Sequence, residues 1–141
     1  MFVLDTNVVS ELRKAKSGRA DSGVVRWATG IPAGAMFISS ITILELELGI
    51  LVVERRDAGQ RSVLQAWFVD KVLPAFDGRI LAVDRDVALR CARLHVPDPR
   101  AVRDALIAAT ALVHGMSVAT RNVADFAPTG VPIVNPWDLA R

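Results

Sequence analysis

The sequence contains very little cysteine and histidine, and this scarcity excludes two common ways of stabilising a small protein. Cys91 is the only cysteine, so no disulfide can form within the chain. The two histidines, His95 and His114, show no zinc-type spacing with it, and a structural zinc site is not expected. Both fall on separate predicted helices, where packing or surface roles are the ordinary explanation.

Long apolar runs are absent as well. Residues 105–113, the longest apolar run near the carboxyl end, are far fewer than the roughly 20 that span a bilayer, and they predict a buried helix. The amino terminus passes from Met1 to Asp5 without a basic segment or a cleavage-site pattern. We therefore expect no membrane partner and a cytoplasmic protein.

The chain also lacks a large excess of charge of one sign. The net charge of +2 is too small to show that nucleic acid is a partner. Arginine nevertheless makes up 14 of the 17 basic residues, and its planar guanidinium suits phosphate oxygens. High-GC codon usage would produce the same bias, so both explanations remain open. With 141 residues, of which 52% are hydrophobic and 23% charged, the composition predicts one globular domain, residues 1–141.

Short apolar strands alternate with helical patterns along the chain. The predicted strands are residues 2–4, 36–38, 79–83, 117–120 and 131–134, and the predicted helices are residues 8–13, 23–28, 42–54, 58–72, 85–95 and 101–114. This alternation predicts an α/β fold with a central, mostly parallel sheet of about five strands. Ligand sites in such sheets form beyond the carboxyl ends of the strands, where Asp5 and residues 120–125 lie.

Two aspartates have both a local and a functional explanation. Asp5 follows the first strand and could cap the next helix, but Thr6 or Asn7 could serve as the cap and leave Asp5 available. Asp104 comes early in a helix that we expect to start at residues 98–99, with an aspartate cap followed by proline, so interaction with the helix dipole could explain it. Small alanines on its face of the helix would also allow a close approach to the sheet.

Glu45 has the same ambiguity. With Thr42 it matches a capping box, in which the two side chains bind each other's backbone donors. The helix is apolar on nearly every side, however, so a carboxylate there is desolvated unless a positive group meets it. Glu47 competes for the same role, and periodicity does not choose between the two.

Taken together, these acids predict a metal site. Several carboxylates from distant parts of the chain cannot be buried side by side as unpaired anions. A divalent cation resolves the conflict, and oxygen ligands without cysteine or histidine select Mg²⁺ or Mn²⁺. Such an ion activates water and stabilises charge on a phosphoryl group.

The order of motifs resembles a known family. The segments that carry the likeness are LDTN (4–7), ISSITILEL (38–46), DALIAATA (104–111), ATRN (119–122) with Asp125, and NPW (135–137). They resemble the PIN-domain ribonucleases, specifically the VapC-type toxins of toxin–antitoxin pairs, including the FitB-like branch. The resemblance implies a three-layer α/β/α domain and the metal Mg²⁺ or Mn²⁺.

The resemblance also marks the site residues. It implies an acidic centre of Asp5, Glu45 and Asp104, with Asp5 and Asp104 as direct metal ligands, and it selects Glu45 over Glu47. Many relatives place a fourth acid where this chain has Asn122. Asp125 could supply the missing charge, or Asn122 could act through a bound water.

The implied function is a metal-dependent endoribonuclease that cleaves RNA, forms a homodimer and is silenced by a cognate VapB-type antitoxin. A groove around four apolar residues is a candidate docking surface: Leu12, Trp27, Leu51 and Trp67. The alternative is a catalytically weakened PIN-fold binding or regulatory subunit, which Asn122 keeps open. A phosphatase of the haloacid dehalogenase kind also opens with a strand ending in aspartate, but it needs a second aspartate where this chain has Asn7.

Overall fold

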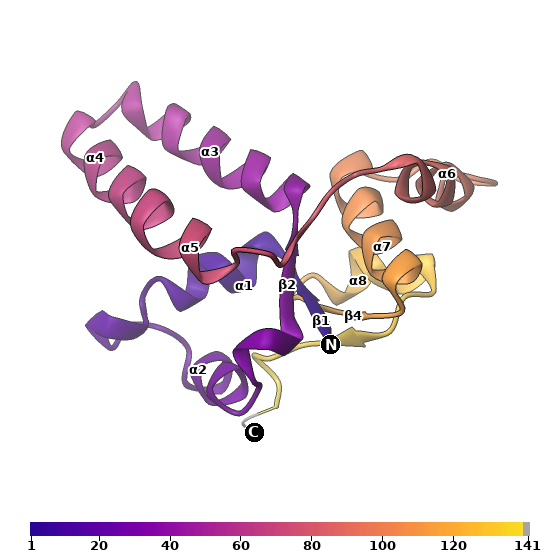
Figure 1. Ribbon diagram of the computed structural model, residues 1–141, viewed down its shortest axis with the longest axis horizontal. Coiled ribbons are helices and arrows are strands. Elements are labelled where there is room, and N and C mark those ends of the chain that lie inside the picture. The colour runs from indigo at the N-terminus through magenta and orange to yellow at the C-terminus, as the bar shows by residue number, and fades with distance from the viewer. Residues whose placement is uncertain (140–141) are drawn as a thin grey trace.

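The computed structural model describes residues 1–139 and shows a five-stranded sheet with helices on both faces (Figure 1). The strands are β1 (Phe2–Leu4), β2 (Met36–Ser39), β3 (Ile80–Leu81), β4 (Ser117–Ala119) and β5 (Ile133–Val134). The helices are α1 (Thr6–Leu12), α2 (Ser22–Thr29), α3 (Ser40–Glu54), α4 (Ala58–Trp67), α5 (Leu73–Ala75), α6 (Arg85–Leu94), α7 (Val102–His114) and α8 (Val123–Phe126). Shorter helical turns are η1 (Ala15–Ser17), η2 (Ala33–Ala35), η3 (Phe68–Val72) and η4 (Ala127–Thr129).

The sheet has the strand order β3-β2-β1-β4-β5, and all of its pairings are parallel. The prediction of an α/β fold with a central parallel sheet is therefore confirmed. Strand β1 lies in the middle, with Val3 opposite Phe37 on one side and Val118 on the other. The carboxyl ends of all strands lie at the same end of the sheet. After β1 and after β4, the chain continues on opposite faces of the sheet. Such a switch in strand order is where ligand sites form in open α/β sheets.

Apolar side chains cover both faces of the sheet, which makes the three layers. Leu4 and Val3 are adjacent in β1 and fully buried, but they point to opposite faces because side chains alternate along a strand. Leu4 packs with residues of α1, α2, α3 and η3, whereas Val3 packs with residues of α7 and α8. Helix α6 lies outside α7 and contacts it through Val87 and Cys91.

Helices α3 and α4 pack side by side and extend away from the sheet (Figure 1). The sequence predicts that α3 is apolar on nearly every side, and several of its apolar side chains are exposed in this chain: Leu44, Leu48, Leu51 and Val52. Within residues 1–139, no helix combines the length and the apolar character that a membrane crossing requires.

Three details of the helices differ from the sequence-based predictions. Ser39 caps α3 by accepting the N–H of Ile41 at 3.0 Å, so the capping box with Thr42 does not form. The predicted helix 58–72 ends as an α-helix at Trp67 and continues as the π-helical turn η3. The expected start of α7 at residues 98–99 is wrong, since α7 begins at Val102.

The delayed start of α7 has a local cause. The backbone N–H of Arg100 donates to His95 Nδ1 at 3.2 Å, and its guanidinium donates to the carbonyl of Leu94 at 2.7 Å. These bonds hold the segment before α7 against the end of α6. The chain can therefore turn into α7 only after Arg100.

Candidate active site

Asp5 lies directly after β1, at the carboxyl ends of the strands, and the residue is only 4% exposed. Its Oδ1 atom accepts the N–H of Thr6 at 2.8 Å, so Asp5 itself caps α1, and the suggestion that Thr6 or Asn7 does so is wrong. Its Oδ2 atom accepts the hydroxyl of Thr120 at 2.7 Å and the amide of Asn7 at 3.2 Å. Asp5 is thus a cap and also a rigidly held carboxylate between β1 and β4.

Burial raises the pKa of the Asp5 carboxyl above its usual range. The hydrogen bonds from Thr120 and Thr6 oppose this rise, and the negative charges of Glu45 and Asp125 add to it. Acids from other parts of the chain therefore lie near enough to Asp5 to influence its ionisation.

Glu45 reaches the same place from the second turn of α3. The hydroxyl of Thr6 donates to Glu45 Oε1 at 2.6 Å, and the hydroxyl oxygen of Thr42 lies 3.0 Å from that of Thr6. Arg103 Nη1 lies 3.6 Å from Glu45 Oε2, so the ion pair joins α3 to the start of α7. The carboxylate thus accepts a hydroxyl at one oxygen and faces a more distant guanidinium at the other.

Asp104 projects from the first turn of α7 and is half-buried. Desolvation, followed by the negative charges of Asp5, Asp125 and Glu45, raises the pKa of Asp104 to about 6, although Arg103 acts in the opposite direction. Burial is thus the main cause of this raised pKa, and the neighbouring carboxylates add to it.

These three acids line one hollow of about 470 Å³, which we call the acid hollow. Its lining residues are Asp5, Thr6, Asn7, Ser10, Glu11, Lys14, Glu45, Asp104, Arg121, Asn122 and Trp137. The structure thus brings together Asp5, Glu45 and Asp104 from β1, α3 and α7. Glu47, the competitor of Glu45, is not among the lining residues.

Asp125 and Asn122 occupy different positions around this centre. Asn122 lines the acid hollow, and its backbone N–H donates to the hydroxyl of Thr120 at 2.9 Å. Asp125 lies on α8, is exposed, and lines a second hollow of about 280 Å³ that shares Asp104 with the first. Its charge acts on Asp5 and Asp104, but its side chain does not line the acid hollow.

Comparison with known proteins identifies the family. The profile of the PIN domain matches residues 2–128. The chain belongs to the PIN-domain family. It is 38% identical to VapC ribonuclease Y4jK of Sinorhizobium fredii, with 99% of this chain and 100% of that protein covered. It is 36% identical to toxin FitB of Neisseria gonorrhoeae, with 97% of this chain and 99% of that protein covered.

The structure of this PIN domain is similar to a solved one. The crystal structure of FitAcB from Neisseria gonorrhoeae superimposes with a TM-score of 0.88 at 34% sequence identity, covering 99% of this chain and 100% of that chain. The family resemblance that the motifs predict is confirmed, and so is the PIN-like fold. The haloacid dehalogenase alternative is wrong, and Asn7 here supports Asp5 by a hydrogen bond.

The donor set of the PIN domain fits Mg²⁺ or Mn²⁺. Within residues 1–139, no three histidine, cysteine, aspartate or glutamate side chains converge closely enough to hold a metal ion by themselves. Mg²⁺ does not require this, because it commonly keeps several waters and binds through one or two carboxylates. Asp5 and Asp104 could provide these, and a cation would favour their charged forms against the burial and the neighbouring carboxylates that raise their pKa values.

Sequence reasoning missed part of the acid hollow. Ser10, Glu11 and Lys14 follow Asn7 at intervals of three, four and seven residues, which places them on one face of α1 and the turn after it. That periodicity could have revealed them. Trp137 could not be found in this way, because it packs under the guanidinium of Arg121 at 5.3 Å only in the folded chain.

The predicted docking groove forms only in part. Leu12 and Trp67 line a mainly apolar hollow of about 250 Å³ between α1 and the end of α4. Trp27 does not line it and instead packs edge-on against Phe2, with the ring centres 5.2 Å apart. Leu51 is exposed on α3.

Proposed function

We propose that this PIN domain is a Mg²⁺- or Mn²⁺-dependent endoribonuclease that acts as the toxin of a toxin–antitoxin pair. The observation that carries the proposal is the meeting of Asp5, Glu45 and Asp104 in one hollow. A relative that matches almost end to end is named a VapC ribonuclease and another a toxin, which supports the same conclusion.

Asp5 and Asp104 would hold the ion. Among the described residues, Asp5 Oδ1 accepts only the Thr6 N–H, and a carboxylate oxygen has a second lone pair that can face a cation. The Thr120 hydroxyl fixes the other oxygen, so the carboxylate cannot rotate freely. A bound divalent cation would supply a water of lowered pKa and stabilise charge on the phosphodiester.

Glu45 would orient the attacking water or accept its proton. Its Oε1 atom is held by the Thr6 hydroxyl, and its Oε2 atom lies toward Arg103. The pairing with Arg103 is long, at 3.6 Å, and the guanidinium is half-exposed, so it can turn toward a substrate phosphate. Arg121, which also lines the hollow, would bind the RNA backbone.

The proposed partners are an antitoxin of the VapB type and a second copy of this chain. The support is the exposed apolar surface on α3, which includes Leu48 and Leu51 at 42% and 45% exposure. Contiguous exposed apolar side chains on a small protein mark interaction surfaces. Since RNA and antitoxin are proposed as partners, the cytoplasm is the proposed site of action.

The test is cleavage of a structured RNA by the purified chain in the presence of Mg²⁺ or Mn²⁺. Asp5→Asn and Asp104→Asn should each lower the rate by at least about a hundredfold, because each removes a charge where the ion binds. Asp98→Asn, an exposed acid outside the acid hollow, is the matched control and should cleave like the wild type. Circular dichroism would show that the variants fold. Full activity in either site variant contradicts the proposal.

A second function has some support from the site. Asn122 stands where an additional acid is expected, and within residues 1–139 no three acids lie close enough to hold a metal ion by themselves. Both features suit a catalytically weakened PIN-fold protein that binds RNA or a regulatory partner. RNA binding without cleavage across a full titration of Mg²⁺ and Mn²⁺ would favour this function over the first.

A further inference from the structure

A second polar hollow lies beside the acid hollow and has the opposite charge. It measures about 660 Å³ and is lined by Arg13, Lys14, Lys16, Ser17, Arg19 and Gln60. We call it the basic hollow. Its lining contains four cations and no acid, although the whole chain carries a net charge of only +2. The positive charge of this protein is therefore locally concentrated.

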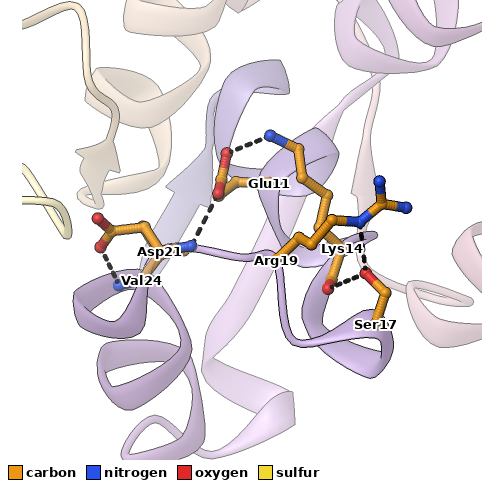
Figure 2. A network of polar contacts seen from close by, with 6 residues as sticks. All are labelled: Glu11, Lys14, Ser17, Arg19, Asp21 and Val24. Carbon is orange, nitrogen blue, oxygen red and sulfur yellow. Dashed lines mark hydrogen bonds and ion pairs between the residues drawn. The ribbon is translucent and has the colours of Figure 1, made fainter.

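The cations of the basic hollow come from one short stretch that internal contacts hold in place. Figure 2 shows that Lys14 pairs with Glu11 at 3.0 Å, while the second oxygen of Glu11 accepts the N–H of Asp21 at 2.8 Å. Glu11 thereby ties the end of α1 to the start of α2. The intervening turn cannot swing freely away from the acid hollow.

Two further contacts position the arginines. The Ser17 hydroxyl donates to the carbonyl of Lys14 at 2.9 Å and accepts Arg19 Nε at 3.3 Å (Figure 2). Arg13 lies over the ring of Trp67, with its guanidinium carbon 5.9 Å from the ring centre. Arg13, Lys16 and Arg19 are all exposed to solvent. Within residues 1–139, none of these three side chains forms an ion pair.

Lys14 lines both hollows, so the two share a wall. The acids of the acid hollow repel a polyanion, and the affinity for RNA must therefore come from cations outside that centre. An extended strand that leaves the acid hollow past Lys14 enters the basic hollow directly. An acidic protein segment would have no comparable reason to continue into the acid hollow.

We propose that the basic hollow binds the phosphate backbone of single-stranded RNA flanking the scissile bond. The inference rests on the proposed ribonuclease function and adds the path of the substrate: across Lys14 and over the turn of residues 15–19. Lys16 and Arg19 are its exposed contacts. Binding through phosphates positions a strand without reading its sequence.

The experiment measures the affinity of the full chain for a fluorescent 20-nucleotide single-stranded RNA in EDTA, so that the strand is not cut, at several salt concentrations. The variant Lys16→Gln with Arg19→Gln keeps polar side chains and should bind roughly tenfold more weakly. The slope of log affinity against log salt should fall by about 1.4, from about 0.7 for each lost phosphate contact on a single strand. Arg90→Gln with Arg93→Gln removes the same charge from the exposed face of α6 and should change neither quantity much.

The outcomes of this binding experiment test the basic hollow separately from RNA cleavage. Unchanged affinity and slope, or an equal loss in the α6 control, would overturn the proposal. If the variant Lys16→Gln with Arg19→Gln binds RNA like the wild type but no longer binds a polyglutamate peptide, the proposal is overturned. The basic hollow would then be assigned to an acidic protein segment. If RNA binds with the expected slope but is never cleaved when metal is added, the ribonuclease proposal fails, and the basic hollow remains a site for the RNA backbone without a neighbouring scissile bond.

Discussion

The hydroxyl of Thr120 donates a 2.7 Å hydrogen bond to Asp5 Oδ2, although the two residues lie 115 positions apart in the sequence. Thr120 is fully buried, and Asp5 nearly so. This bond links the ends of β1 and β4 and fixes the carboxylate around which the acid hollow is built. Substitutions at this bond can therefore separate effects on the stability of the fold from effects on the reaction at the site.

Replacing Thr120 with valine should destabilise the protein, because valine fills the same space but leaves the buried carboxylate without its shortest donor. The expected loss in the free energy of unfolding is about 1–3 kcal/mol, measured by urea denaturation. Thr120→Ser keeps the hydroxyl and removes a buried methyl, which costs about 1 kcal/mol. A larger loss in the serine variant than in the valine variant would contradict the importance of this bond.

Glu45 and Glu47 offer a matched pair on one helix. Glu45→Gln can still accept the Thr6 hydroxyl, so the fold should survive, but the side chain can no longer take up a proton from water. We expect a fall in kcat of at least about tenfold, in line with general base contributions. Glu47→Gln, outside the acid hollow, should leave RNA cleavage unchanged. Equal rates for the two variants would remove Glu45 from the mechanism.

The raised pKa of Asp104, about 6, predicts how the metal-free protein responds to pH. Since this pKa lies above the usual value for aspartate, the folded state binds a proton more tightly than the unfolded state between pH 4 and 6. The contribution of Asp104 to stability is thus fully present below pH 4 and is lost as the pH rises through 6.

Asp104→Asn removes this titration and provides the measurement. In EDTA, the variant should be similar to the wild type in stability near pH 4 and more stable near pH 7. Adding Mg²⁺ should raise the melting temperature of the wild type at pH 7 more than that of the variant, because the ion replaces the missing proton. A wild type that becomes more stable than the variant as the pH rises in EDTA would contradict this account.

The contribution of Glu11 to stability depends on pH in the opposite direction to that of Asp104. The N–H of Asp21 is the main cause that lowers the pKa of Glu11, so its contribution to stability is present above the unfolded pKa and is lost as the pH falls. Glu11→Ala should lower the free energy of unfolding by about 1 kcal/mol at pH 7. The loss should shrink on acidification to pH 3. Glu54→Ala, which removes an exposed ion pair with Arg61 at 3.8 Å, should cost less at pH 7.

The strands of this protein could be predicted from the sequence because each is a short apolar run between polar residues. Helix starts were less predictable. Thr42 and Glu45 have the spacing of a capping box, but Ser39 is already placed to cap α3, and Glu45 is drawn to Thr6 instead. The start of α7 depends on contacts of Arg100 with the preceding helix, which no local pattern reveals.

The acids of the site could be predicted as a group because family motifs mark them, and chemistry explains why they need a cation. Their supporting contacts could not. The bond from Thr120 to Asp5 and the pairing of Arg103 with Glu45 join segments far apart in the chain. Asp125 illustrates the same limit, since its charge is felt at Asp104 while its side chain faces another hollow.

The central position of β1 also bears on when the site forms during folding. Asp5 precedes its donor Thr120 by 115 positions, so the two residues meet only after the intervening chain has folded back on itself. The neighbouring strand β4 must be in place before the carboxylate of Asp5 is oriented. The acid hollow is therefore completed only late in folding, and a partly folded chain in which β4 has not joined the sheet lacks an oriented Asp5 carboxylate.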